Sequence, residues 1–215
     1  MKRLILLLLV FTSLLGNGQS VVRRLSPATT SRDSVSDCPH MKFMGIPLDG
    51  TLASFSTQLQ KKGFKQIKLF DSKQMNFFVG NFAGYADCLV YVMAVSPEDR
   101  RVVGGGVTFP PDEEWSGLSL QYETLKRRLT SKYGEPSVCI ERFQTSPQPD
   151  NDFMRMHYVE SGLCEYRCGF KMDEGIIGLE IAHKEGGISD FNYVSLTYID
   201  GANVEVMEQD AINDL

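Results

Sequence analysis

Five cysteines, at positions 38, 88, 139, 164 and 168, are the residues of this chain best suited to covalent or metal chemistry. Cys164 and Cys168 cannot bridge each other in an extended strand, because four residues at about 3.3 Å each separate their Cα atoms by roughly 13 Å, against a bridging limit of about 7 Å. Three interpretations stay open for this pair: small buried side chains, a bridge from one of them to Cys88 or Cys139, or metal ligation. The odd count leaves at least one thiol unpaired unless two chains are joined.

The three histidines, His40, His157 and His183, offer little acid–base chemistry. We expect His157 inside a strand and His183 at the end of one, both as surface or edge residues. The metalloprotease motif H-E-x-x-H and the hydrolase motif G-x-S-x-G are missing from the sequence. Cys38-Pro39-His40 has no second Cys/His cluster at zinc spacing, so the sequence predicts no metal and no cofactor.

Two further clusters have plain structural interpretations. Asp112, Glu113 and Glu114 precede a predicted helix, where negative charge is favourable, so we interpret them as capping and dipole residues. The glycine run 104–106 lacks the Lys-Ser/Thr of a phosphate loop. We expect a bend or bulge there, with bare backbone that permits close approach of a ligand or another chain. Trp115 is expected to pack against the adjacent helix or the strand ends.

Two amphipathic helices are predicted, and each is followed by a series of short strands. The first helix spans residues 49–62, with Leu52, Phe55 and Leu59 on one face, and the second spans residues 116–132. The predicted strands are short apolar or alternating runs bounded by turn residues; they cover 64–70, 75–82, 85–96, 101–109, 137–144, 153–161, 164–172, 176–183 and 191–199. The pattern predicts an α+β fold of two tandem helix-plus-antiparallel-meander units, residues 41–112 and 113–203, with the helices packed on one face of the sheet.

Alternation along the strands separates a core face from a wet face. In 164–172, Glu165 and Arg167 alternate with apolar residues, and in 191–199, Tyr193 and Thr197 do so. We take Glu165, Arg167, Tyr193 and Thr197 as the candidate binding residues of the wet face. The run 85–96 is apolar on both sides, which predicts a strand inside the sheet that is covered on both faces.

The first residues have the order of a secretory signal. Lys2 and Arg3 precede an apolar run over 4–15, and the small residues Gly16 and Gly18 follow. The run has about 12 residues, short of the roughly 20 that a membrane-spanning helix needs. The sequence therefore predicts a signal peptide over 1–18, a flexible arm over 19–40 and a tail over 204–215, and a periplasmic or extracellular location with no integral membrane segment after cleavage.

Charge excludes one class of partner. The chain has 22 Lys and Arg against 27 Asp and Glu, a net charge of −5. An acidic surface cannot neutralise many phosphates, so we expect no nucleic-acid partner.

Two short motifs carry a resemblance. The pattern F-x-G-x-F-A-G-Y over 78–85 and the run K-Y-G-E-P over 132–136 resemble a group of uncharacterised secreted bacterial proteins. The layout of two helix-plus-four-strand units also resembles, in topology, the β-lactamase inhibitory protein and related small envelope proteins. This resemblance implies that the open face of the sheet is where a partner docks.

These observations predict an exported, non-enzymatic binding or interaction protein, whose partner is an envelope or secreted protein. The alternative is an envelope hydrolase that acts on glycan or peptide, with His157 or Glu160 as general base. A structural role in envelope assembly stays open as an alternative to the binding function. The sequence does not indicate which oligomeric state the protein has.

Overall fold

A computed structural model describes residues 39–184 and 190–204. The predicted signal peptide, most of the predicted arm and nearly all of the predicted tail lie outside these described residues. Within the described ranges, no helix combines the length and the apolar character that a membrane crossing needs.

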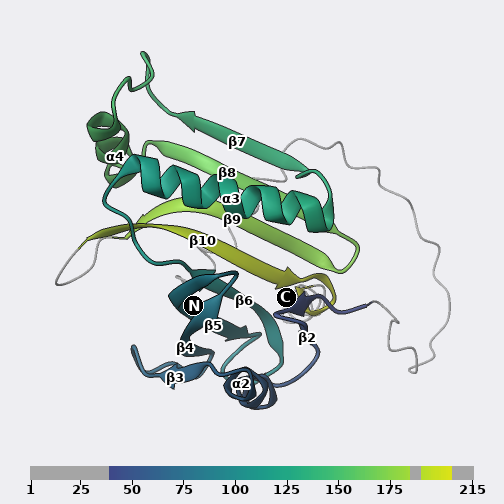
Figure 1. Cartoon of the computed structure of the whole chain (residues 1–215). Helices are drawn as coiled ribbons and strands as arrows, with labels where there is room; N and C mark the ends of the chain where they lie inside the picture. Colours follow the sequence, from purple (N-terminus) through teal and green to yellow (C-terminus); the bar gives the residue numbers. More distant parts are fainter. Residues whose placement is uncertain (1–38, 185–189, 205–215) are drawn as a thin grey trace, which may run out of the picture. The chain divides into compact units, whose positions relative to one another are not determined.

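The described elements make an α+β fold with a large antiparallel sheet, as the α+β part of the predicted fold class states (Figure 1). In chain order they are β1 (Lys42–Phe43), β2 (Ile46–Pro47), α2 (Leu52–Lys61), β3 (Lys65–Ile67), β4 (Met75–Phe82), β5 (Tyr85–Ala94), β6 (Val102–Thr108), α3 (Trp115–Tyr133), β7 (Val138–Phe143), α4 (Asp152–Glu160), β8 (Cys164–Met172), β9 (Gly175–Lys184) and β10 (Phe191–Asp200). Eight of these strands form one sheet in the order β3-β4-β5-β6-β10-β9-β8-β7.

The sheet consists of two meanders that meet in its middle. Strands β3 to β6 follow one another and pair with their neighbours, as do β7 to β10, and the two series join where β6 pairs with β10. Strands β4 and β8 have the bounds that the sequence predicts. Strand β3 is shorter than predicted, because Leu69 and Phe70 are 51% and 55% exposed and lie beyond its pairing with β4.

Helices α2 and α3 bury the apolar stripes that the sequence predicts for them. The Thr51 side chain caps α2 by accepting the Ser54 N–H, and Leu52, Phe55 and Leu59 are buried against the sheet. Helix α3 contacts β9 and β10 and buries Leu118, Tyr122, Leu125 and Leu129 along one stripe. Trp115, at its first turn, is 7% exposed and packs against Phe143 and Tyr166, as expected for a core residue.

The strand register gives the sheet a core face and an opposite face, which we call the second face. Val90, Leu179 and Leu196 lie on the core face, in one cluster with the buried residues of α2 and α3. The alternate side chains point to the second face. There Met93, Val95 and Val103 form a smaller buried cluster near Ile199 and Val204. Strand β5 is therefore covered on both sides at this end, as its two-sided apolar pattern predicts.

The prediction of a strand over 153–161 is wrong, because these residues form helix α4. The Asn151 side chain accepts the Met154 N–H at 2.9 Å and starts the helix. Met156 and Val159, three residues apart, are its buried positions. Gly162 follows with a φ of 69°, a conformation that favours glycine after a helix. His157 thus lies on a helix, not in a strand.

The glycine run is occupied by the chain's own aromatic rings, so the expectation of bare backbone is wrong. A Cβ on Gly105 would lie 2.9 Å from Phe43 Cδ1, and a Cβ on Gly106 would overlap the hydroxyl oxygen of Tyr91. Phe43 belongs to the β1–β2 hairpin, which the sequence analysis missed. Gly105 and Gly106 thus let two rings pack closely on opposite faces of β6.

Candidate functional site

The four candidate binding residues all lie on the second face. Glu165 and Arg167 come from β8, and Tyr193 and Thr197 come from β10, with β9 between them. The register pairs Arg167 with Glu180 and Glu180 with Ser195, so a polar row crosses three strands. Sequence alternation in β9 could have identified Glu180, because it stands between the buried Leu179 and Ile181.

Arg167 is the most unusual member of this row. Its Nη2 donates to Glu165 Oε1 at 3.3 Å, and its side chain is 21% exposed. Its Nε, however, is buried and has no hydrogen-bond partner within residues 39–184 and 190–204. A buried donor without an acceptor costs about 1–3 kcal/mol. Because this nitrogen is buried, a partner can contact only the exposed part of the Arg167 side chain.

Glu180 lies beside Arg167 in a low-polarity environment. Burial raises the pKa of its carboxyl group, while the hydrogen bond from Ser195 Oγ, at 3.1 Å, and the charge of Arg167 oppose that rise. Burial also raises the pKa of the neighbouring Tyr193. The row therefore combines one guanidinium with groups that hold their protons more tightly than in water.

Thr197 positions a tyrosine. Its hydroxyl lies 3.1 Å from the Tyr91 hydroxyl, and Thr197 itself is 5% exposed. Burial raises the pKa of Tyr91 to about 12, so the phenol stays protonated at neutral pH. Because Thr197 is itself buried, its role on this face is to hold the Tyr91 hydroxyl in place.

The charges of the second face differ in sign from those of the whole chain. Along β7, β8 and β9 it carries Arg142, Arg167, Lys171 and Lys184 against Glu165 and Glu180, a balance of +2 on a chain of −5. Arg142 Nε donates to Glu165 Oε2 at 2.9 Å. Lys171 and Lys184 are exposed and have no ion-pair partner among the described residues.

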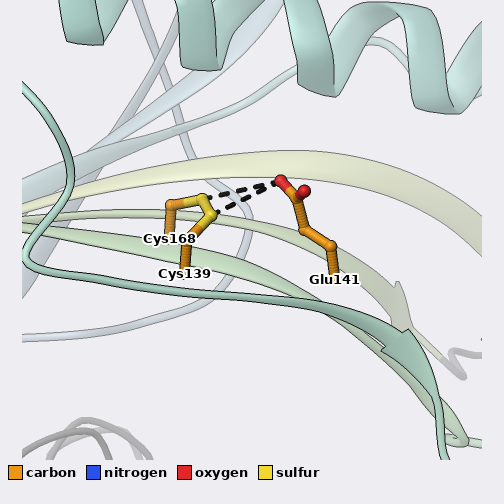
Figure 2. A group of neighbouring side chains, drawn as sticks. All are labelled: Cys139, Glu141 and Cys168. Atoms are coloured by element: carbon orange, nitrogen blue, oxygen red, sulfur yellow. Dashed lines mark hydrogen bonds between the residues drawn. A yellow bond between two sulfur atoms is a disulfide. The ribbon is translucent and has the colours of Figure 1, made fainter.

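A second group of chemically capable side chains lies on the core face, at the edge of the sheet (Figure 2). Cys139 on β7 and Cys168 on β8 are direct cross-strand partners and form a disulfide. Of the interpretations left open for Cys168, the structure shows the bridge to Cys139. Glu141, two residues after Cys139 on the same strand, points to the same place.

The remaining described cysteines are free thiols. Cys88 is buried in the main core, and Cys164 is half-buried beneath α4. Burial raises the pKa of Cys88 to about 11 and that of Cys164 to about 12, so both stay protonated and unreactive at neutral pH. Cys38 lies outside the described residues.

Helix α4 borders two cavities. One, of about 550 Å³, is lined by acidic and aromatic side chains: Glu113, Glu114, Trp115, Asp152, Phe153, Met156, His157 and Glu160. The other, of about 430 Å³, lies between α4 and β9 and includes Glu160, Cys164 and His183. His157 and Glu160, the general bases of the alternative prediction, therefore share one concave polar site.

The acidic run before α3 has the capping role in part. Glu114 stands at the N-cap without a side-chain cap bond, and Asp112 Oδ1 accepts the Glu114 N–H at 2.9 Å. The other two histidines have structural partners: His40 Nδ1 lies 3.0 Å from Asp200 Oδ2, and His183 Nδ1 lies 2.8 Å from Asn192 Oδ1.

Comparison of the chain with family models, with curated proteins and with solved structures finds no match.

Proposed function

We propose that this chain is an exported, non-enzymatic binding protein that recognises an acidic polypeptide through the second face of its sheet. The observation that carries the proposal is the guanidinium of Arg167, whose side chain is 21% exposed on this face and which donates to a single carboxylate, Glu165, among the described residues. A carboxylate of a partner would pair with the exposed part of this guanidinium, and guanidinium–carboxylate pairs are among the strongest hydrogen-bonded contacts in proteins.

Charge supports the same class of partner. The +2 balance of the second face along β7, β8 and β9 attracts acidic segments, although the chain as a whole carries −5. Lys171 and Lys184 lie toward opposite ends of this region, with Arg167 between them. An extended acidic segment that lies along β8 and β9 would meet all three cations.

The architecture of the proposed protein is a pair of tandem helix-plus-four-strand units. Helix α2 followed by β3 to β6 and helix α3 followed by β7 to β10 support this division. With the helices on one face, the second face is left for a partner, in line with the resemblance to the β-lactamase inhibitory protein and to secreted bacterial proteins. The signal-like residues 1–18 support export to the periplasm or the medium.

The candidate residues have separate roles in this proposal. Arg167 binds the partner's carboxylate, and Glu165 holds Arg167 and Arg142 in place. Tyr193, which packs against Phe191 with ring centroids 5.4 Å apart, supplies an aromatic contact surface. Thr197 positions Tyr91.

The test is an NMR titration of the ¹⁵N-labelled chain with a short oligoglutamate peptide, with an oligolysine peptide of the same length as the control. We expect the oligoglutamate to shift the backbone amides of β8, β9 and β10, and the oligolysine to leave them unchanged. The double variant Arg167→Glu, Lys171→Glu should weaken oligoglutamate binding by about tenfold or more. Tyr193→Ala should weaken it less.

The matched control is Lys61→Glu, Lys62→Glu, which makes the same charge change at the exposed end of α2. Equal weakening by this control, or amide shifts elsewhere on the chain, would contradict the proposal. Concentration-dependent shifts of the same amides without peptide would assign the face to a second copy. If oligoglutamate binds only after residues 205–215 are deleted, the second face is the binding site of the chain's own acidic residues 205–215.

Hydrolysis of envelope glycan or peptide is a second candidate function, and one observation favours it. The cavity of about 550 Å³ brings His157 and Glu160 together with three other carboxylates. Dye-labelled cell-wall glycan and dye-labelled casein would test it, with Glu160→Gln and His157→Ala as variants. Release of dye by the wild type but by neither variant would establish the hydrolase and remove the non-enzymatic proposal.

A further inference from the structure

We infer that reduction of the Cys139–Cys168 disulfide converts the cluster of Cys139, Glu141 and Cys168 into a binding site for Zn²⁺. The ligand atoms of the three residues lie within 4.8 Å of one another. Glu141 Oε1 lies 3.4 Å from Cys139 Sγ and 3.8 Å from Cys168 Sγ (Figure 2).

These two distances match the geometry of a zinc site. With a Zn–S bond of about 2.3 Å and a Zn–O bond of about 2.1 Å, the sulfur–oxygen edge of a tetrahedral site is about 3.6 Å. The two observed separations lie on either side of this value. Glu141 thus already stands where the third ligand of a zinc ion would be, and only the two sulfurs must move apart.

The sheet fixes this arrangement. Cys139 and Glu141 are two residues apart on β7, so both point to the core face, and Cys168 lies directly opposite Cys139 on β8. Because β7 is the edge strand of the sheet, Cys139 and Glu141 are exposed, whereas Cys168 is 1% exposed. A bound ion would therefore keep one position open to water or to a further ligand.

Helix α3 supplies the groups around the cluster. The Tyr122 hydroxyl lies 3.0 Å from Cys168 Sγ, where it can donate a hydrogen bond to a thiolate and orient it. Lys126 Nζ donates to Glu141 and also to Glu123, 2.9 Å away. When a zinc ion takes the Glu141 oxygen, Lys126 therefore keeps a carboxylate partner.

The redox step needs an external dithiol. One of its thiolates attacks the exposed Cys139 sulfur, the Cys139–Cys168 bond breaks, and Cys168 leaves as a thiolate that takes up a proton. The second thiol of the reductant then displaces Cys139, which also takes up a proton, and the reductant ends as its own disulfide. Zn²⁺ displaces both thiol protons when it binds. The disulfide and the metal site are thus mutually exclusive states.

The test uses Co²⁺, because cobalt–thiolate bonds give a near-ultraviolet absorption band. The other three cysteines are replaced in the tested chain by Cys38→Ser, Cys88→Ser and Cys164→Ser. We expect the band after reduction, no band in the oxidised chain, and loss of the band when Zn²⁺ is added. Cys168→Ser should abolish it, and Glu141→Gln should weaken Co²⁺ binding by about tenfold or more. Glu135→Gln, an exposed carboxylate outside the cluster, is the matched control and should bind Co²⁺ as the wild type does.

Absence of the band in the reduced chain would overturn the inference, as would equal Co²⁺ affinity of the wild type and Glu141→Gln. An unfolded reduced chain could still bind cobalt through its thiols, but its affinity would not depend on Glu141. Circular dichroism of the reduced chain with and without Zn²⁺ reports the fold directly. Zn²⁺ should also slow re-formation of the disulfide in the wild type more than in Glu141→Gln.

Discussion

The ring of Phe43 lies directly over Gly105, so that a Cβ on this glycine would stand 2.9 Å from Phe43 Cδ1. Phe43 is completely buried, and its centroid lies 5.0 Å from that of Tyr198. The β1–β2 hairpin thus packs on the central strands at the point where the two meanders join. This contact explains the glycine at position 105, whereas a Cβ on Gly106 would meet the Tyr91 ring and one on Gly104 would meet the Tyr198 backbone oxygen.

Gly105→Ala should lower the free energy of unfolding by about 2 kcal/mol, as overpacking of a filled core does. The new methyl group would meet both the Phe43 ring and, at 2.9 Å, the backbone oxygen of Tyr91. Urea unfolding measures the change. The double variant Gly105→Ala, Phe43→Leu should recover part of the loss, and no recovery would show that the ring is not the obstacle.

Asp200 ties the start of the described chain to the end of β10. The carboxylate is fully buried, accepts the Met41 N–H at 2.7 Å and accepts the Asn203 N–H at 3.0 Å. Asp200→Ala would leave two buried donors unpaired, so we expect a loss of about 3 kcal/mol in the free energy of unfolding. The exposed Asp173→Ala is the control and should change stability by less than about 0.5 kcal/mol.

Glu180 should make stability fall as pH rises. Burial raises the pKa of its carboxyl group above the ordinary value of 4.5, so the folded chain binds this proton more tightly than the unfolded chain does. The contribution of Glu180 to the free energy of unfolding is therefore fully present below about pH 4.5 and is lost as the pH rises through the raised pKa. Urea unfolding of the wild type and Glu180→Gln over this range should show the wild type losing stability relative to the variant. A constant difference between the two would refute the expectation.

The sequence predicted the parts of this fold that depend on local periodicity. The stripes of α2 and α3 and the alternation of β4 and β8 are visible because each element buries one regular face. The same alternation separated Glu165, Arg167, Tyr193 and Thr197 from the core. It did not reveal the packing of Phe43 on Gly105, because that contact joins residues far apart in the chain.

Helix α4 shows where periodicity failed. It is short, and its two buried positions, Met156 and Val159, give too little pattern to distinguish a helix from a strand. Its cap at Asn151 was the available signal. Asn151→Ala should lower the free energy of unfolding by about 1 kcal/mol. Asp150→Ala should have a smaller effect, because the Asp150 carboxylate accepts from the Asn151 side chain and caps no backbone N–H of the described helix. Urea unfolding of the two variants would compare them, and an equal effect would argue against the cap.

The partner of Cys168 could not be chosen from the sequence, because pairing across strands depends on register. Cys139 and Cys168 become neighbours only because β7 pairs with β8 in this register. The position of Glu141 is predictable from the sequence, because a residue two positions from Cys139 on a strand lies on the same face as Cys139. Residue spacing therefore identifies Cys139 and Glu141 as neighbours on one face, and the pairing of β7 with β8 adds Cys168.

Reduction of the disulfide should destabilise the chain by about 3 kcal/mol, because the bridge closes a loop between cysteines 29 residues apart and limits the unfolded ensemble. Urea unfolding with and without a dithiol reductant measures this loss. Cys139→Ser removes the bridge, so reductant should no longer change its stability, and its free energy of unfolding should match that of the reduced wild type. The disulfide holds β7, whose only strand partner among the described residues is β8. Hydrogen exchange of the β7 amides should therefore rise on reduction more than that of the β9 amides. Unchanged β7 exchange would mean that the backbone ladder and the contacts of Phe143 hold the strand without the bridge.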